Sequence, residues 1–393
     1  HGFDPAKRWP VTILLDPHAE AMEVVSTYQS VADKHGQILV GSLDFKNGLD
    51  MERSNRIVSS LLQEATGILH ADPSAIHLMG FSGGAKAAIA AATSLPGISM
   101  LTYCGAAFPQ GAVQLPLPTL GIAGIKDMNF TEVLNFTTTL DTTPYLHAFF
   151  VSESDHSWPD TAVFELTMGW ADAWRCRNSK LCDSLSLATD ALLSRQRIAA
   201  EKDLVRRDLL LHFHVAAFHD IVSVSEERDA MSQNQRSADF RAAMGTFVSE
   251  LDRENKKRQE LAAAFTSKDL SWWKPTIRAL KTSTDPVSAR LADYCSLAAY
   301  SYSRSSIDAG EQNNAAYFID LYQLVDPDNS EWAYLRACLC EQGGDRPGAI
   351  RNLNLAFRMG MKDPDKIRQE KWLTSALSDA QIVRLLDEMD QAR

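Results

Sequence analysis

A serine flanked by glycines is the residue of this chain best suited to chemistry. Ser82 is the centre of the stretch GFSGG, residues 80–84, which fits the pattern G-x-S-x-G. An apolar run precedes the stretch and a run of small residues follows it. Where a strand turns sharply into a helix, a serine at the corner is lifted above the sheet, and its hydroxyl can act as a nucleophile. The stretch therefore predicts covalent catalysis through Ser82.

Two other interpretations of this stretch need weighing. A phosphate-binding loop of the type G-x-x-x-x-G-K-[ST] needs glycine before Lys86 and a hydroxyl after it, and the chain has Ala85 and Ala87 there. The hydroxyl that would hold Mg²⁺ is missing, so this alternative is rejected. An ordinary tight turn between a strand and a helix remains open, because G-x-S-x-G is common by chance.

An acid and a histidine follow Ser82 in the order that serine-based acyl transfer uses. Asp127 directly follows one predicted strand, and His156 follows the next. Both lie at carboxyl ends of strands, where open α/β sheets place their sites. We predict Ser82 as nucleophile, His156 as base and Asp127 as the acid that orients it. Asp155 is the competing acid, but neighbouring side chains in a loop rarely face each other.

The elements that must position these residues alternate between strands and helices. Short apolar runs at 11–17, 37–44, 75–81, 99–106, 117–124 and 145–153 predict strands. Runs at 21–36, 53–70, 85–95 and 163–175 predict helices. Repeated alternation of this kind predicts a parallel sheet with helices on both faces.

Residues 1–175 resemble the esterases of the α/β-hydrolase superfamily that are related to polyhydroxybutyrate depolymerases, feruloyl esterases and dienelactone hydrolases. Four stretches carry the resemblance: ILLDPHAEA at 13–21, GFSGGAK at 80–86, AGIKDMNF at 123–130 and DHSWP at 155–159. The resemblance implies an α/β-hydrolase fold and a serine esterase. Its substrate would be a small-molecule or carbohydrate-linked carboxylic ester.

The resemblance also implies an oxyanion hole and a substrate pocket beside the serine. The backbone N–H groups of Gly83 and Glu20 are expected to form the hole. The loop at 16–21 departs from the family, which usually has glycine where this loop has alanine. His18, Asn129 and Trp158 are expected to line the pocket, with ordinary hydrogen-bonding, turn and packing roles as their alternatives.

The chain is expected to contain three regions. An α/β-hydrolase domain at 1–175 would be followed by a helical linker or bundle at 176–284 and by helical hairpins at 285–393. From about residue 181 the strand patterns vanish and amphipathic helical patterns replace them. The expected fold class is therefore α/β followed by an all-α region.

The helical hairpins have a repeating length. Two pairs of helices, at 289–329 and 330–364, span 41 and 35 residues, which is close to the tetratricopeptide period of about 34. The second pair resembles that family at Trp332, Leu335, Ala349, Ala356 and Pro364. The resemblance implies a protein partner bound to the repeats, and a generic helical bundle is the alternative.

Composition excludes several classes of function. The net charge of −11 argues against general binding to nucleic acid or to an anionic membrane, both of which favour basic patches. No apolar run approaches a membrane span. The six cysteines form neither a CxxC pair nor a zinc pattern with histidine. We therefore expect no cofactor and no metal.

Localisation rests on weaker signals. The chain opens with HGFDPAKRWP, without Met, so a leader and edge strands are expected before it. Relatives with His-x-Trp-Pro loops are often exported, which favours a periplasmic or secreted protein over a cytoplasmic one. Cys176 and Cys182 can form a disulfide in an oxidising compartment, although buried thiols are the favoured interpretation.

Two further functions stay open beside the esterase. A degenerate hydrolase domain could serve as a scaffold for the helical repeats, with Ala19 and Glu20 as the trace of lost catalysis. The intact order of Ser82, Asp127 and His156 favours catalysis over this scaffold. A serine peptidase is the other alternative, but no insertion of the size of a lid domain separates the predicted strands.

Overall fold

The computed structural model describes residues 3–108, 115–179 and 184–391. The chain divides into two compact units, His1–Asp252 and Arg253–Arg393. The boundaries expected near residues 175 and 284 stay predictions. None of the helices in the described ranges combines the length and apolar character that a membrane crossing requires.

The first unit is built on a parallel sheet with the strand order β2-β1-β3-β4-β5-β6. The strands are β1 (Trp9–Leu15), β2 (Ile38–Gly41), β3 (Ala71–Phe81), β4 (Met100–Cys104), β5 (Thr119–Gly124) and β6 (His147–Ser152). Their pairing is parallel throughout, with Ile13 opposite Leu78 and Gly80 opposite Tyr103. The predicted strands are therefore present.

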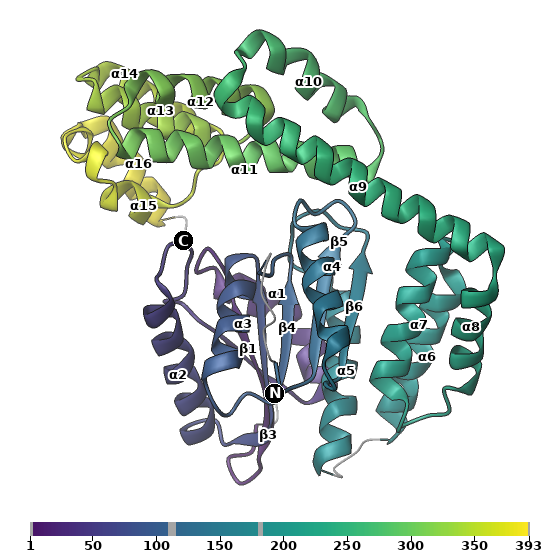
Figure 1. Ribbon diagram of the computed structural model, residues 1–393. Coiled ribbons are helices and arrows are strands. Elements are labelled where there is room, and N and C mark those ends of the chain that lie inside the picture. Colours follow the sequence, from purple (N-terminus) through teal and green to yellow (C-terminus); the bar gives the residue numbers. More distant parts are fainter. Residues whose placement is uncertain (1–2, 109–114, 180–183, 392–393) are drawn as a thin grey trace. The chain divides into compact units, whose positions relative to one another are not determined.

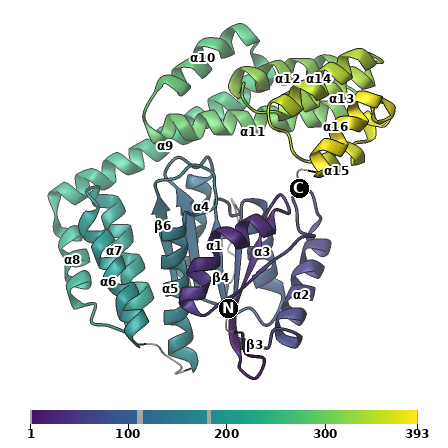
Figure 2. The ribbon, with the colours of Figure 1, turned by 180° about the vertical axis from the view of Figure 1, so that it is seen from behind.

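Helices cover both faces of this sheet (Figure 1). They are α1 (Ala21–His35), α2 (Met51–Gly67), α3 (Gly83–Ser94), α4 (Phe130–Thr139) and α5 (Thr161–Ser179). A short 3₁₀ turn, η1 (Leu140–Thr142), follows α4. Seen from behind, α1 lies in front of the sheet (Figure 2). This arrangement confirms the expected fold class.

Alternation along the strands explains the two layers. In β1 and β3, Ile13 and Leu78 belong to a core shared with α2, α3 and α4. The next residues, Leu14 and Met79, belong to a second core shared with α1 and α5. Successive side chains of a strand point to opposite faces, so an apolar strand covered on both sides fills two cores.

Four helices follow the sheet. They are α6 (Ser184–Ala200), α7 (Leu204–Phe218), α8 (Ser225–Arg236) and α9 (Ala238–Ser267). The core that contains α1 and α5 also contains Leu187 of α6 and Phe213 of α7. The ring of Phe213 lies 5.7 Å from that of Phe150 in β6. Thus α6 and α7 belong to the core of the first unit, which continues through α8 into α9 and ends at Asp252.

The second unit is entirely helical in the residues described. Its helices are α10 (Leu270–Thr282), α11 (Pro286–Asp308), α12 (Gln312–Val325), α13 (Glu331–Gln342), α14 (Arg346–Arg358), α15 (Pro364–Gln369) and α16 (Ala380–Gln391), with 3₁₀ turns η2 (Lys371–Leu373) and η3 (Ala376–Ser378). Asp285, Asp345 and Asp363 cap α11, α14 and α15, and each precedes a proline within two residues. Aspartate caps followed by proline define helix starts.

The pairs α11/α12 and α13/α14 are antiparallel helical hairpins (Figure 1). The five residues singled out for the tetratricopeptide resemblance are buried: Trp332, Leu335, Ala349, Ala356 and Pro364. Burial in a hairpin fits a generic bundle equally well, so the tetratricopeptide assignment stays a prediction.

The sequence favours buried thiols for the cysteines, and the structure contradicts this expectation at one of them. Cys104, Cys295, Cys338 and Cys340 are free thiols. Cys176 is disulfide-bonded, so the expectation of a buried thiol there is wrong. Cys182, the partner considered for it, lies outside the described residues.

Candidate active site

Ser82 occupies a strained corner between β3 and α3. Its backbone has φ 52° and ψ −119°, a left-handed conformation that costs about 1–3 kcal/mol in a residue with a side chain. The corner is tight, because a Cβ on Gly80 would meet the carbonyl oxygen of Gly84 at 2.1 Å. A Cβ on Gly84 would meet the carbonyl oxygen of Leu15 at 2.0 Å. The glycines of G-x-S-x-G are therefore required by close backbone approach.

The three residues selected from the sequence form one hydrogen-bonded chain. The Nδ1 atom of His156 lies 3.0 Å from Asp127 Oδ1, and its Nε2 atom lies 3.0 Å from Ser82 Oγ. An ionised carboxylate only accepts hydrogen bonds, so Nδ1 carries the proton and Nε2 accepts from the Ser82 hydroxyl. This is the relation between nucleophile, base and orienting acid in serine catalysis.

Asp127 is held in place from two sides. Its side chain is 1% exposed, and Oδ1 also accepts a hydrogen bond from the backbone N–H of Asn129 at 2.8 Å. The Asn129 side chain donates to the carbonyl of Gly105 at 2.8 Å. Gly105 has φ 66°, and a Cβ there would lie 2.9 Å from Asp127 Oδ2. The Asn129 side chain thus bonds to the loop after β4, and its place in a substrate pocket stays a prediction.

The loop that carries His156 is anchored at its far end. The indole N–H of Trp158 donates to Asp16 Oδ2 at 2.8 Å, and the hydroxyl of Tyr28 donates to the carbonyl of Pro159 at 2.5 Å. Burial raises the pKa of Tyr28 well above its usual value, so the hydroxyl remains a donor. Trp158 therefore anchors the loop through its indole N–H. Its predicted place in a substrate pocket stays a prediction.

The loop after β1 is organised by the carboxylate of Asp16. This side chain is 3% exposed, and Oδ1 accepts from the backbone N–H groups of His18 at 2.8 Å and Glu20 at 3.1 Å. The N–H of Glu20 is thus engaged, and its assignment to an oxyanion hole stays a prediction that requires this bond to break. The side chains of His18 and Glu20 are exposed. Ala19 has φ 63°, a conformation that glycine adopts more readily than alanine.

An asparagine from the loop after β2 reaches the same corner. The backbone N–H of Asn47 donates to the carbonyl of Pro17 at 2.8 Å. Its side-chain amide lies against Gly83, where a Cβ would meet Asn47 Oδ1 at 1.8 Å. Asn47 therefore connects the loop after β1 with the residue that follows the serine.

Neighbouring groups do not compete with this chemistry. Burial, and then the charge of Asp127, raises the pKa of the Cys104 thiol well above its usual value, so it stays protonated. Asp155 is exposed, and His156 bonds to Asp127 instead, as expected. Lys86 pairs with Glu132 at 3.1 Å, away from any phosphate-loop geometry.

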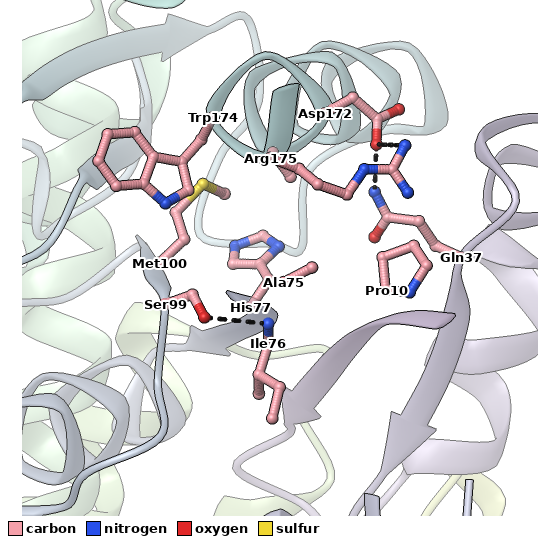
Figure 3. Close-up of a pocket in the computed structure, with 11 residues that line it drawn as sticks. Pro10, Gln37, Ala75, Ile76, His77, Ser99, Met100, Asp172, Trp174 and Arg175 are labelled. Carbon is pink, nitrogen blue, oxygen red and sulfur yellow. Dashed lines mark hydrogen bonds and ion pairs between the residues drawn. The ribbon is translucent and has the colours of Figure 1, made fainter. Parts of the chain in front are cut away.

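Two pockets of the first unit lie at the amino ends of strands, whereas Ser82 lies at a carboxyl end. One measures about 670 Å³ and is lined by residues that include Pro118 and His147. The other is a cavity of about 10 Å³, lined by residues that include Ile76 and Met100 (Figure 3). A volume of that size holds a single water molecule. Neither pocket contains Ser82.

Two positioning residues escaped the sequence analysis. Asp16 directly follows β1, and a carboxylate at the carboxyl end of a strand was a signal that could have identified it. Tyr28 lies in the middle of α1 among other amphipathic positions. Nothing in the local pattern distinguishes its hydroxyl from that of any packing tyrosine.

Comparison with known proteins gives likeness only at the level of structure. No protein-family model matches the chain, and no curated protein matches it. Solved structures do show similarity. An uncharacterized protein from Bacillus cereus ATCC 10987 is 14% identical with a TM-score of 0.38, over 44% of this chain and 62% of that protein. The chain thus spans less than two thirds of that relative.

Two carboxylesterases are covered more completely. The carboxylesterase from Mesorhizobium loti is 16% identical with a TM-score of 0.35, over 40% of this chain and 88% of that protein. The Bacillus cereus carboxylesterase is 15% identical with a TM-score of 0.35, over 44% of this chain and 91% of that protein. The function of this chain is therefore argued from the geometry of its own residues.

Proposed function

We propose that this chain is a serine hydrolase that cleaves a carboxylic ester through an acyl-enzyme. The observation that carries the proposal is the hydrogen-bonded chain from Ser82 Oγ through His156 to Asp127. The strained conformation of Ser82 adds support, because such strain persists where function requires it.

In the first half-reaction, Ser82 Oγ attacks the ester carbonyl while its proton passes to His156 Nε2. The buried carboxylate of Asp127 stabilises the imidazolium that forms. The tetrahedral intermediate then expels the alkoxide, which takes the proton from Nε2 and leaves as the alcohol. Ser82 is left as an acyl ester, and His156 is neutral again.

In the second half-reaction, water gives a proton to His156 Nε2 and attacks the acyl carbon. The C–Oγ bond breaks, Ser82 recovers the proton, and a carboxylic acid leaves. Each half-reaction places negative charge on the carbonyl oxygen, so donors must face it.

For those donors we propose the backbone N–H of Gly83 and the side-chain amide of Asn47. Gly83 is the first residue of α3, so its N–H has no acceptor within the helix, and the helix dipole favours an anion there. Asn47 lies against Gly83. In this proposal the Asn47 amide takes the place of the backbone N–H of Glu20, because that N–H already donates to Asp16.

Turnover of p-nitrophenyl acetate, with mass spectrometry of the quenched enzyme, tests the proposal. The expected result is hydrolysis by the wild type and an acetylated peptide that contains Ser82. Ser82→Ala should lower kcat by at least about 10⁴-fold. Ser99→Ala, in a serine outside the hydrogen-bonded chain, is the matched control and should change little.

Absence of turnover in the folded wild type would contradict the proposal and favour the scaffold alternative. The matching p-nitroanilide separates the esterase from the peptidase, since faster cleavage of the amide would overturn the choice of an ester.

A further inference from the structure

Three potential metal ligands converge away from the serine site, on helices of the first unit. They are His35 at the end of α1, Glu165 of α5 and Asp190 of α6. Each offers one ligand atom, and these atoms all lie within 4.8 Å of one another. They are far apart in the sequence, so no short motif marks them.

Two of the converging side chains are buried, and each has one polar atom without a hydrogen-bond partner among the described residues. These atoms are His35 Nε2 and Asp190 Oδ2. The His35 side chain is 0% exposed and Asp190 is 1% exposed. A buried polar atom left unpaired costs about 1–3 kcal/mol, and native proteins rarely leave two together. The cluster therefore lacks a group that would satisfy both atoms.

The carboxylate of Asp172 determines which nitrogen of His35 carries the proton. Asp172 Oδ2 lies 2.7 Å from His35 Nδ1. Its Oδ1 atom accepts from Gln37 at 3.2 Å and pairs with Arg175 at 3.1 Å, as the dashed lines of Figure 3 show. Carboxylate oxygens accept hydrogen bonds, so the Nδ1–H of His35 donates to Asp172. The lone pair of Nε2 is then directed away from Asp172.

What remains is a space bordered by acceptors. His35 Nε2 and the carboxylates of Glu165 and Asp190 border this space, and Lys34 donates to Glu165. A positive ion resolves this arrangement. A histidine whose Nδ1–H bonds to a carboxylate while Nε2 is free is the usual arrangement of a metal-bound imidazole.

We propose that His35, Glu165 and Asp190 bind a divalent transition-metal ion, with Zn²⁺ as the best fit. Ca²⁺ and Mg²⁺ prefer ligand sets made only of oxygen, whereas imidazole suits zinc. Three protein ligands leave a fourth position for water. The Glu165 side chain is 26% exposed, so an ion can enter from its side.

The packing of the helices fixes one ligand and leaves another free to adjust. Asp190 packs closely against Gly169 of α5. A Cβ added to Gly169 would lie 3.1 Å from the Cβ of Asp190. Zinc ligands lie about 2.0–2.2 Å from the ion, so the ligand atoms must draw closer together on binding. Glu165 can make this movement by changing rotamer, at the expense of its ion pair with Lys34. The ion would join α1, α5 and α6.

The test is zinc binding by the full chain. Protein stripped with EDTA is titrated with ZnCl₂, its bound zinc is measured by elemental analysis, and its Tm is recorded with and without the ion. The expected result is about one Zn²⁺ per chain and a Tm raised by zinc but not by CaCl₂. Asp190→Asn and Glu165→Gln should each weaken binding by at least about tenfold.

Two controls locate the site. Asp141→Asn breaks the surface pair with His147, a matched histidine–carboxylate pair, and should leave zinc binding unchanged. Glu20→Gln alters a second group of potential ligands, Asp16, His18 and Glu20, and should also leave zinc binding unchanged. Failure of the stripped wild type to bind zinc would overturn the proposal. Wild-type affinity in both Glu165→Gln, whose side chain is partly exposed, and Asp190→Asn would also overturn it.

Discussion

At the scale of single residues, the chemistry depends on which hydrogen bonds each polar atom already makes. Ser82, His156 and Asp127 are joined by two bonds of 3.0 Å, which hold the imidazole in the orientation that the proposed mechanism requires. Asp16 engages the N–H groups of its own loop and so determines which donors remain for an oxyanion. These existing hydrogen bonds indicate which polar groups are available for catalysis, and the residue types alone do not.

Replacing the orienting acid should separate the two candidate aspartates. In Asp127→Asn the amide can donate to Nδ1, which favours the wrong tautomer of His156, so we expect kcat for ester hydrolysis to fall by about 10⁴-fold. Asp155→Asn is the matched control, since its side chain is exposed, and kcat should change less than about threefold. Similar losses in both variants would contradict the assignment.

The proposed amide donor can be tested in the same assay. Asn47→Ala removes the side chain beside Gly83, and we expect kcat to fall by about 10²-fold with little change in KM, as for loss of one oxyanion donor. Asn55→Ala, in a half-buried asparagine of α2 whose side chain donates to Ser94, provides the control. An unchanged kcat in Asn47→Ala, with active wild type, would return the role to the loop after β1.

At the scale of elements, buried polar groups make the stability of each unit depend on a few contacts. In β3, His77 lies between the hydroxyls of Thr102 and Thr12, at 2.8 and 3.4 Å from its two ring nitrogens. In the second unit, Glu254 of α9 is fully buried and accepts from Arg290 of α11 at 2.9 Å. Both contacts join neighbouring elements inside a core.

His77 should make the first unit sensitive to acid. Burial lowers the pKa of His77 to about 3, whereas an exposed histidine has a pKa of about 6.5. Between about pH 3 and about pH 6.5 this histidine is protonated in the unfolded chain but neutral in the native state. The free energy of unfolding therefore falls as the pH falls below about 6.5. From pH 6.5 to pH 5, wild type should lose about 2 kcal/mol more than His77→Asn in urea unfolding. Equal losses in both proteins would contradict this.

The ion pair in the second unit should be costly to break. Glu254→Gln leaves the buried guanidinium of Arg290 without its charge partner, and we expect about 3–5 kcal/mol of destabilisation. Glu260→Gln breaks the exposed pair with Lys257 on the same helix and should cost under about 1 kcal/mol. Urea unfolding of both variants makes the comparison, and similar midpoints would refute it.

The strands and the sharp corner at Ser82 could be predicted from the sequence for definite reasons. Apolar strands buried on both faces and glycines at a tight corner leave local signals, so the sheet and the position of Ser82 could be predicted. Contacts between segments that are distant in the sequence leave no such local signal. The bond from Trp158 to Asp16, the pinning of Pro159 by Tyr28 and the convergence on Asp190 all depend on tertiary packing.

At the scale of the whole molecule, the chain contains two units with separate cores. The helices α6 and α7 belong to the core of the first unit, whereas the hairpins from α11 onward share a core of their own. The role of those hairpins in binding a protein partner stays a prediction. A periplasmic or secreted location also stays a prediction, although the disulfide at Cys176 fits an oxidising compartment.

Truncation should reveal where the first unit ends. A chain ending at Asp252 keeps the first unit whole, so we expect it to fold and to retain ester hydrolysis. A chain ending at Arg175 loses buried residues of the sheet core: Leu187, Ala191, Phe213, Ala217 and Phe218. We expect that shorter chain to aggregate or unfold. Near-UV circular dichroism and activity would show it, and a folded, active 1–175 fragment would contradict the prediction.

Labelling with a fluorophosphonate probe tests the central claim most directly, because the probe needs an activated serine and no particular substrate. We predict that folded wild type is labelled at Ser82 and that Ser82→Ala and His156→Ala are not labelled. Folded wild type that resists the probe, or labelling that persists in Ser82→Ala, would contradict the account of Ser82 as the nucleophile.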